Sequence, residues 1–274
     1  AIETSFTNWL ELSLQVADPE TQWEVVNCGG VSYASYRLVP ILQEVLEYEP
    51  DMVIVCTGHN EFLEDRSYGP VKRTPRWIAR SHAWLSRLHT YNAARSISIW
   101  LRGDQTPQAV EHAPELPEEV DAMLDYPGGL DDYRRDALWR QRTVAHYEFT
   151  LRRMATLAAQ QGVPLVLVNP PYNLKDTVPF KYLNRAGITS EEKQAFDSLW
   201  AEANAEELTV PERIELLRQA IEIDDQHAGV HYHLAQCLRS QFEFEESKTH
   251  FIAAKDEDIC PLRILSSMRR AVFD

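Results

Sequence analysis

The chain has 274 residues, of which 44% are hydrophobic and 25% are charged, as is ordinary for a globular protein. Its formal net charge of −15 argues against a nucleic-acid partner, whose binding surface would need a basic stripe. No stretch approaches the roughly 18 apolar residues of a membrane span. Four cysteines lack the spacing of a zinc site, so we expect no metal and no organic cofactor.

The N-terminus leaves the compartment open. The chain begins at Ala1 without a methionine, and no signal peptide is visible. We therefore expect a processed or excised piece of a longer protein. An extracytoplasmic location, or a membrane anchor upstream of Ala1, is compatible with this expectation.

The first part of the chain predicts alternating helices and strands. Residues 1–16 predict a helix that packs on a sheet, and residues 24–26 predict a short strand. Apolar residues at helical spacing predict a second helix over residues 35–48. The apolar run at residues 52–58 predicts a strand that is covered on both faces, as in a parallel sheet. A right-handed crossover would bring both strand ends to one edge of that sheet, where ligands bind.

Two loops at that edge carry the donors of an oxyanion site. Gly29, Gly30 and Ser32 can point backbone N–H groups into a cleft, and Asn60 adds a side-chain amide just after the second strand. Donors aimed in this way stabilise a tetrahedral oxyanion. Plain turn chemistry is the alternative, because glycine and asparagine are common in turns.

Residues 66–136 are predicted to form a helical and loop insertion that caps the site. Within it, residues 76–101 alternate apolar and basic positions at helical spacing. A plain packing helix and a membrane-surface helix are alternatives for that pattern. Residues 131–161 then predict a long helix that Gly162 caps, and residues 163–169 predict a further buried strand.

The loop after that strand, residues 170–182, would lie at the same edge of the sheet. Asn173, Lys175 and Asp176 are candidates for contacts with the substrate there. The alternative is a surface loop whose polar groups satisfy one another.

Apolar residues recur 34 positions apart in the C-terminal part, as at Leu217 and Phe251 and at Ala220 and Ala254. This period is typical of tetratricopeptide repeats, in which each repeat is a pair of helices. We expect such repeats over residues 191–274, after an α/β core over residues 1–190. They are the expected docking surface for a peptide or protein partner, and an ordinary helical subdomain is the alternative.

The two loops together resemble the SGNH, or GDSL, hydrolase family. The family's second block is similar to residues 27–34, and its third block, G-x-N-D/E, is similar to residues 58–61. The resemblance implies a three-layer, flavodoxin-like parallel sheet and makes Asn60 the side-chain donor of the oxyanion hole. Ser32 occupies the position of the family's glycine donor, so Gly29 or Gly30 is an alternative. His59 and Glu61 flank Asn60 and are candidates for substrate contacts.

The resemblance places the family's nucleophilic serine and its C-terminal D-x-x-H block, which supplies the histidine base, outside this chain. It implies a serine esterase or acyl hydrolase of the SGNH type, acting on a small-molecule or glycan ester through a Ser-His-Asp mechanism. Two alternatives stay open: an O-acyltransferase, and a non-catalytic protein-binding scaffold on a degenerate hydrolase-like core.

Overall fold

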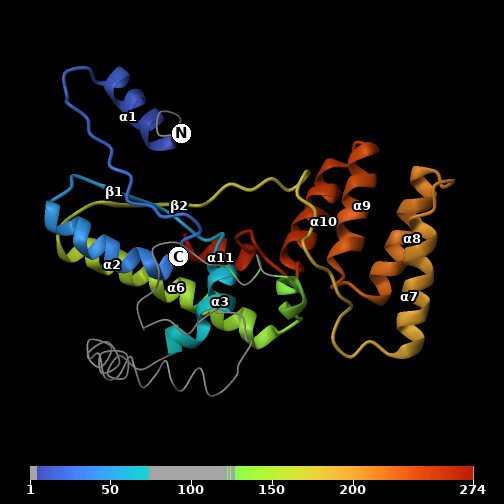
Figure 1. Cartoon of the computed structure of the whole chain (residues 1–274). Helices are drawn as coiled ribbons and strands as arrows, with labels where there is room; N and C mark the ends of the chain where they lie inside the picture. The colour runs from blue at the N-terminus through green and yellow to red at the C-terminus, as the bar shows by residue number, and fades with distance from the viewer. Residues whose placement is uncertain (1–4, 74–121, 123, 125–126, 274) are drawn as a thin grey trace, which may run out of the picture. The chain divides into compact units, whose positions relative to one another are not determined.

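The computed structural model describes residues 5–73, 122, 124 and 127–273, and the chain separates into two compact units, Ala1–Val31 and Ser32–Asp274 (Figure 1). The first unit holds one described helix, α1 (Phe6–Ala17), which Ser5 caps by accepting a hydrogen bond from the backbone of Asn8. This confirms the helix predicted near the N-terminus.

The strand predicted at residues 24–26 is wrong. The backbone N–H of Val25 donates to the Glu11 carboxylate over 2.7 Å, and the segment belongs to no described sheet. Val26 is exposed, so this three-residue apolar run buries too little surface to hold a strand in place.

The described part of the second unit contains one parallel sheet of two strands, in which Val53 pairs with Leu165 and Cys56 with Val168. The expected three-layer, flavodoxin-like sheet is therefore wrong, since most of the described chain is helical. The two strands predicted at residues 52–58 and 163–169 are confirmed. The elements around them are α2 (Ser35–Val45), η2 (Leu46–Tyr48), β1 (Val53–Cys56), α3 (Glu61–Arg73), η4 (Gly129–Asp132), α6 (Ala137–Gln160) and β2 (Leu165–Val168).

Within the described part of the second unit, one face of this sheet is well covered and the other is not. Val55 is buried in the core, whereas Ile54 and Val166 are 41% and 42% exposed. Side chains alternate between the two faces of a strand, so these exposed residues mark the uncovered face. The predicted burial of both faces is wrong.

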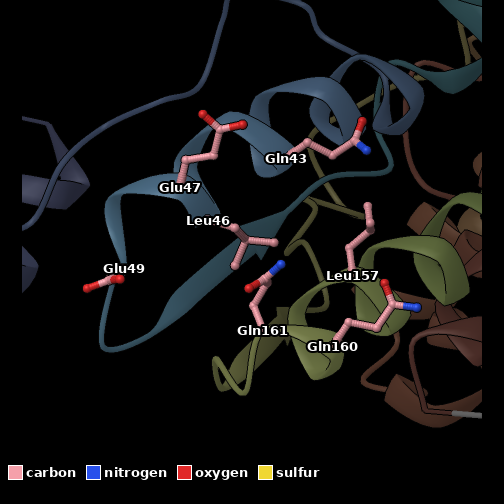
Figure 2. Close-up of a pocket in the computed structure, with 7 residues that line it drawn as sticks. All are labelled: Gln43, Leu46, Glu47, Glu49, Leu157, Gln160 and Gln161. Carbon is pink, nitrogen blue, oxygen red and sulfur yellow. The ribbon is translucent and has the colours of Figure 1, made fainter.

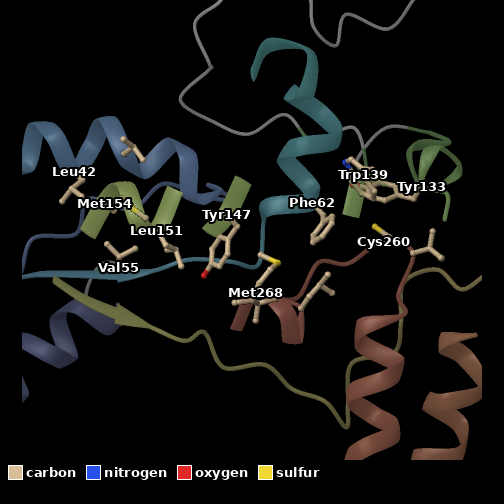
Figure 3. Close-up of a cluster of buried hydrophobic side chains, with 14 of the residues drawn as sticks. Leu42, Val55, Phe62, Tyr133, Trp139, Tyr147, Leu151, Met154, Cys260 and Met268 are labelled. Carbon is tan, nitrogen blue, oxygen red and sulfur yellow. The ribbon is translucent and has the colours of Figure 1, made fainter. Parts of the chain in front are cut away.

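The core of the second unit lies between α2, α3, α6, the covered face of the sheet and a short helix near the C-terminus, α11 (Ser266–Ala271) (Figure 3). Phe62 of α3 meets Trp139 of α6 edge to face, and Met268 of α11 is fully buried. Segments that are far apart in the sequence therefore share one core.

Helix α6 is shorter than predicted at its start. Asp136 caps it by accepting from the backbone N–H of Trp139, while residues 129–132 form the separate turn η4. At its other end, Gly162 adopts a left-handed conformation with φ 71°, as the predicted glycine cap requires.

Two buried carboxylates of α3 hold the first turn of α2. Glu61 accepts from the backbone N–H and the hydroxyl of Ser35, over 2.6 and 3.0 Å. Glu64 accepts from the backbone N–H of Ala34 and forms an ion pair with Arg37. Both glutamates are at most 1% exposed, so these contacts are shielded from water.

The C-terminal part folds as packed pairs of helices. They are α7 (Ser190–Ala203), α8 (Val210–Ile223), α9 (Ala228–Ser240) and α10 (Phe244–Asp256). α8 and α10 begin 34 residues apart, in agreement with the predicted period. A separate hydrophobic cluster, centred on Leu217, Val230 and Leu234, packs α7, α8 and α9 together.

The segment that joins β2 to α7 is bound to the repeats by two aspartates 34 residues apart. Asp258 accepts from the backbone N–H groups of Phe180 and Lys181, and Asp224 accepts from that of Arg185. Both aspartates are fully buried. Equivalent positions of the two repeats thus hold successive parts of one extended segment.

Much of the predicted cap lies outside the described residues, because positions 74–121 are not among them. Of the helices in the described ranges, none combines the length and the apolar character needed to cross a bilayer.

We expect Glu64→Ala to lower the free energy of unfolding by roughly 3 kcal/mol or more, because it leaves the Arg37 guanidinium buried without its carboxylate. Urea unfolding followed by circular dichroism measures this difference. Asp197→Ala breaks the exposed Lys193–Asp197 pair and is the matched control, which should leave the midpoint nearly unchanged. Equal effects of the two changes would contradict the proposed importance of the buried pair.

Candidate active site

The loop after β1 begins at a glycine that no other residue can replace without movement. Gly58 has φ 133°, and a Cβ atom there would lie 2.7 Å from the Ile264 side chain. The carbonyl of the preceding Thr57 accepts a hydrogen bond from the buried Tyr147 hydroxyl over 3.1 Å. The core and the C-terminal segment therefore fix where this loop leaves the strand.

His59 joins three segments of the chain. Its Nδ1 accepts from the backbone N–H of Ile264, and its Nε2 lies 3.1 Å from the Pro171 carbonyl. Because Nδ1 is an acceptor, Nε2 carries the proton and donates to Pro171. Burial lowers the pKa of His59, and the nearby Arg263 and Lys255 lower it further. His59 is thus a neutral side chain with both ring nitrogens engaged, and its predicted contact with substrate stays a prediction.

Asn60 lies at the start of α3, and its carbonyl accepts from the backbone N–H of Glu64. The side-chain amide is half-buried and makes one long hydrogen bond, 3.5 Å, to the Tyr33 carbonyl. An amide carries two N–H bonds, so donor capacity remains for a further acceptor. An N–H group that is free to donate is what an oxyanion-binding site requires of such an amide.

Ser32 has a left-handed backbone conformation. Its φ is 61°, in the left-handed region that glycine adopts most readily. Its backbone N–H makes no hydrogen bond to a described residue. Ser32 and Asn60 belong to the same compact unit. The backbone N–H of Ser32 and the side-chain amide of Asn60 can each donate to a further acceptor.

The two glycines proposed as alternative donors belong to the first unit. The N–H of Gly29 is already used, because it donates to the Asn27 side chain over 3.0 Å in a local turn. Gly30 is exposed and its N–H makes no hydrogen bond within the described ranges. Among the backbone donors, Gly29 is therefore the least available.

Glu61 is held by the backbone and side chain of Ser35 and is 1% exposed. Its position indicates that it supports the loop, since a buried carboxylate with these partners does not face solvent. The predicted contact of Glu61 with substrate stays a prediction.

Asn173, Lys175 and Asp176 form an exposed turn that satisfies itself. Asn173 accepts from the backbone N–H of Asp176 and donates to its carboxylate, which lowers the pKa of that carboxyl group. The carbonyl of Lys175 accepts from Tyr232 and Gln236, which places the turn against α9. The structure brings Pro171 to the Asn60 loop through His59, whereas this turn lies on the repeats.

One pocket, of about 360 Å³, lies between the end of α2 and the end of α6 (Figure 2). A second pocket of about 340 Å³ lies along α6. No predicted site residue lines either one. The first is lined by Gln43, Leu46, Glu47, Glu49, Leu157, Gln160 and Gln161.

Histidines of the repeats are packed rather than grouped for metal binding. His227 lies against Tyr182, Phe196 and Trp200 and caps α9 by accepting from the backbone of Val230. Within the described residues, no group of three or more His, Cys, Asp or Glu side chains is arranged to hold a metal ion.

The aspartates that hold the linking segment were not predicted, although the sequence carries a signal for them. Asp224 and Asp258 are separated by the repeat period of 34 and follow the second helix of their repeats. Arg135 was also missed. It donates to the carbonyls of Leu183, Asn184 and Gln226, a role that no local pattern indicates.

Comparisons with protein-family models, with curated proteins and with solved structures find no match for this chain. The residues of the two loops therefore carry the functional argument by themselves.

We expect Ser32→Gly to change the free energy of unfolding by less than about 1 kcal/mol, because relief at positive φ is offset by the greater freedom of glycine in the unfolded chain. Ser32→Val should destabilise by roughly 1–2 kcal/mol, because a β-branched residue is strained at this φ. Chemical denaturation of both variants measures the difference. Equal stability of the glycine and valine variants would contradict the left-handed assignment.

We expect the protein to lose stability as the pH falls from about 6.5 to about 4. Burial lowers the pKa of His227 from 6.5 to about 4, so the unfolded chain binds a proton in this window that the folded chain excludes. Stability is therefore complete above pH 6.5, and His227 alone accounts for a loss of about 3 kcal/mol on acidification. Urea unfolding at several pH values measures the slope.

His227→Asn is the matched variant, because asparagine also caps helices. His233 and His250 have pKa values lowered by burial as well, so the variant should reduce the slope without removing it. An unchanged slope would show that His227 takes up its proton equally in both states.

Proposed function

We propose that this chain supplies the oxyanion-binding donors of a serine-dependent ester hydrolase of the SGNH type. The observation that carries the proposal is the state of the Asn60 amide: half-buried, weakly bonded and fixed from both sides. His59 anchors the loop before it, and the buried Glu61 anchors α3 after it. A donor held in this way needs little reorganisation when charge develops on the substrate.

In the proposed mechanism, a serine attacks the ester carbonyl while a histidine takes its proton. The carbonyl oxygen becomes an oxyanion that accepts hydrogen bonds from the Asn60 amide and the Ser32 backbone N–H. The proposal assigns these donors to the described residues, and the resemblance places the nucleophilic serine and the histidine base outside this chain. The substrate class is a small-molecule or glycan ester, and transfer to an acceptor hydroxyl in place of water gives the O-acyltransferase alternative.

We expect Asn60→Ala, made in the full protein as it occurs in the cell, to lower kcat for ester hydrolysis by roughly two to three orders of magnitude. KM and the unfolding midpoint should change little, because the amide makes a single long hydrogen bond to the described residues. Steady-state hydrolysis of p-nitrophenyl acyl esters measures both constants.

Asn204→Ala is the control for this experiment. It removes an exposed asparagine whose amide bonds the Trp200 carbonyl in the repeats, so kcat should stay the same. Unchanged turnover in Asn60→Ala would remove this residue from the mechanism. If the full protein neither hydrolyses the esters nor reacts with a fluorophosphonate, the hydrolase proposal is wrong.

A second candidate is a protein-binding scaffold. The observation that favours it is the separation of the described pockets from the Asn60 loop, together with exposed aromatic side chains on the well-packed repeats. A protein that binds a partner but is not labelled by a fluorophosphonate would favour the scaffold.

A further inference from the structure

The turn between α9 and α10 contains a bulky residue where helices usually place glycine. The backbone N–H of Phe242 donates to the Arg239 carbonyl, and that of Glu243 donates to the Leu238 carbonyl. These two bonds define the Schellman ending of a helix, whose left-handed position is Phe242, with φ 65°.

The same chain uses glycine in the same geometry. At the end of α6, Gly162 donates to Ala159 and Val163 donates to Ala158, with φ 71° at Gly162. A bulky residue at positive φ is a rare and strained choice. Phe242 therefore strains the backbone at a helix end of the kind where this chain uses glycine elsewhere.

The Phe242 ring contributes little packing in return. The side chain is 78% exposed, and its described ring contact is an edge-to-face approach to Phe244, 6.0 Å between centroids. Phe244 is itself 53% exposed. Strain that the fold does not need, together with exposed aromatic surface, indicates a functional position.

The surroundings of these rings show which chemistry fits them. The guanidinium of Arg239 already lies 6.0 Å from the centroid of the Phe244 ring, so one ring of the pair holds an arginine of the same chain. Glu243 and Glu245 alternate with the two rings in the sequence, and both are exposed. The whole chain carries a net charge of −15, which attracts basic partners.

We propose that the α9–α10 turn, defined by Phe242, Glu243, Phe244 and Glu245, is a docking surface for an arginine-bearing segment of a partner protein. The partner's guanidinium stacks on the exposed Phe242 ring, as Arg239 stacks on Phe244, and the two carboxylates pair with its charge. The inference is independent of the proposed ester hydrolysis, because it uses none of the residues around Asn60.

The test is a titration of the full chain with a short arginine-rich peptide at physiological salt, followed by NMR of backbone amides. A peptide with citrulline in place of arginine is the matched ligand, since citrulline keeps the planar group and removes the charge. We expect saturable shifts centred on residues 239–246 with the arginine peptide and none with the citrulline peptide.

Phe242→Gly is the decisive variant, because it relieves strain and should fold at least as well as the parent chain. It should weaken peptide binding by about tenfold, the value of one cation–π contact of moderate strength. Glu243→Gln should weaken binding less. Tyr48→Ala removes another exposed aromatic residue, 78% exposed, and should change neither binding nor stability.

Three outcomes of the binding experiments would overturn the proposal. They are equal binding by Phe242→Gly and the parent chain, shifts spread over the acidic surface, and absence of saturable binding at millimolar peptide. A lowered unfolding midpoint in Phe242→Gly would also overturn it, because the ring would then serve the fold.

Discussion

The placement of two carboxylates at the start of α2 is the constraint on which the candidate site depends. Residue 34, which precedes this helix, is an alanine, so its side chain cannot cap the free N–H groups. Glu61 and Glu64, three residues apart on α3, supply the acceptors from the other side of the core. Asn60 directly precedes this anchored turn. The same two buried carboxylates thus fix how α2 packs on α3 and where the Asn60 amide lies.

The repeats are tied to the sheet by the segment that links them. Asp224 and Asp258 hold its backbone, and Tyr232 and Gln236 of α9 bond the carbonyl of Lys175. Part of the α9 surface is therefore occupied by the chain itself. A partner that approaches the repeats finds the α9–α10 turn free, where an aromatic pair faces solvent.

Local patterns in the sequence predicted the elements better than their assembly. The apolar runs at residues 52–58 and 163–169 predicted β1 and β2, and the period of 34 predicted the helix pairs. The three-layer sheet that the family resemblance implied is wrong, and residues 24–26, which satisfied a strand pattern, belong to no described sheet, with the backbone N–H of Val25 bonded to Glu11. At the site, the placement of Ser32 and Asn60 in loops could be predicted from the sequence. The way in which His59 and Glu61 hold the Asn60 loop could not, because their hydrogen-bond partners lie elsewhere in the sequence.

The long separation between His59 and Ile264 has a consequence for biogenesis. The loop that holds Asn60 is complete only when a backbone N–H that lies 205 residues later has reached His59 Nδ1. Contacts of this length form late, because closing the intervening chain costs entropy before the contact is gained. During synthesis on the ribosome, the early segments therefore wait for residue 264 to emerge.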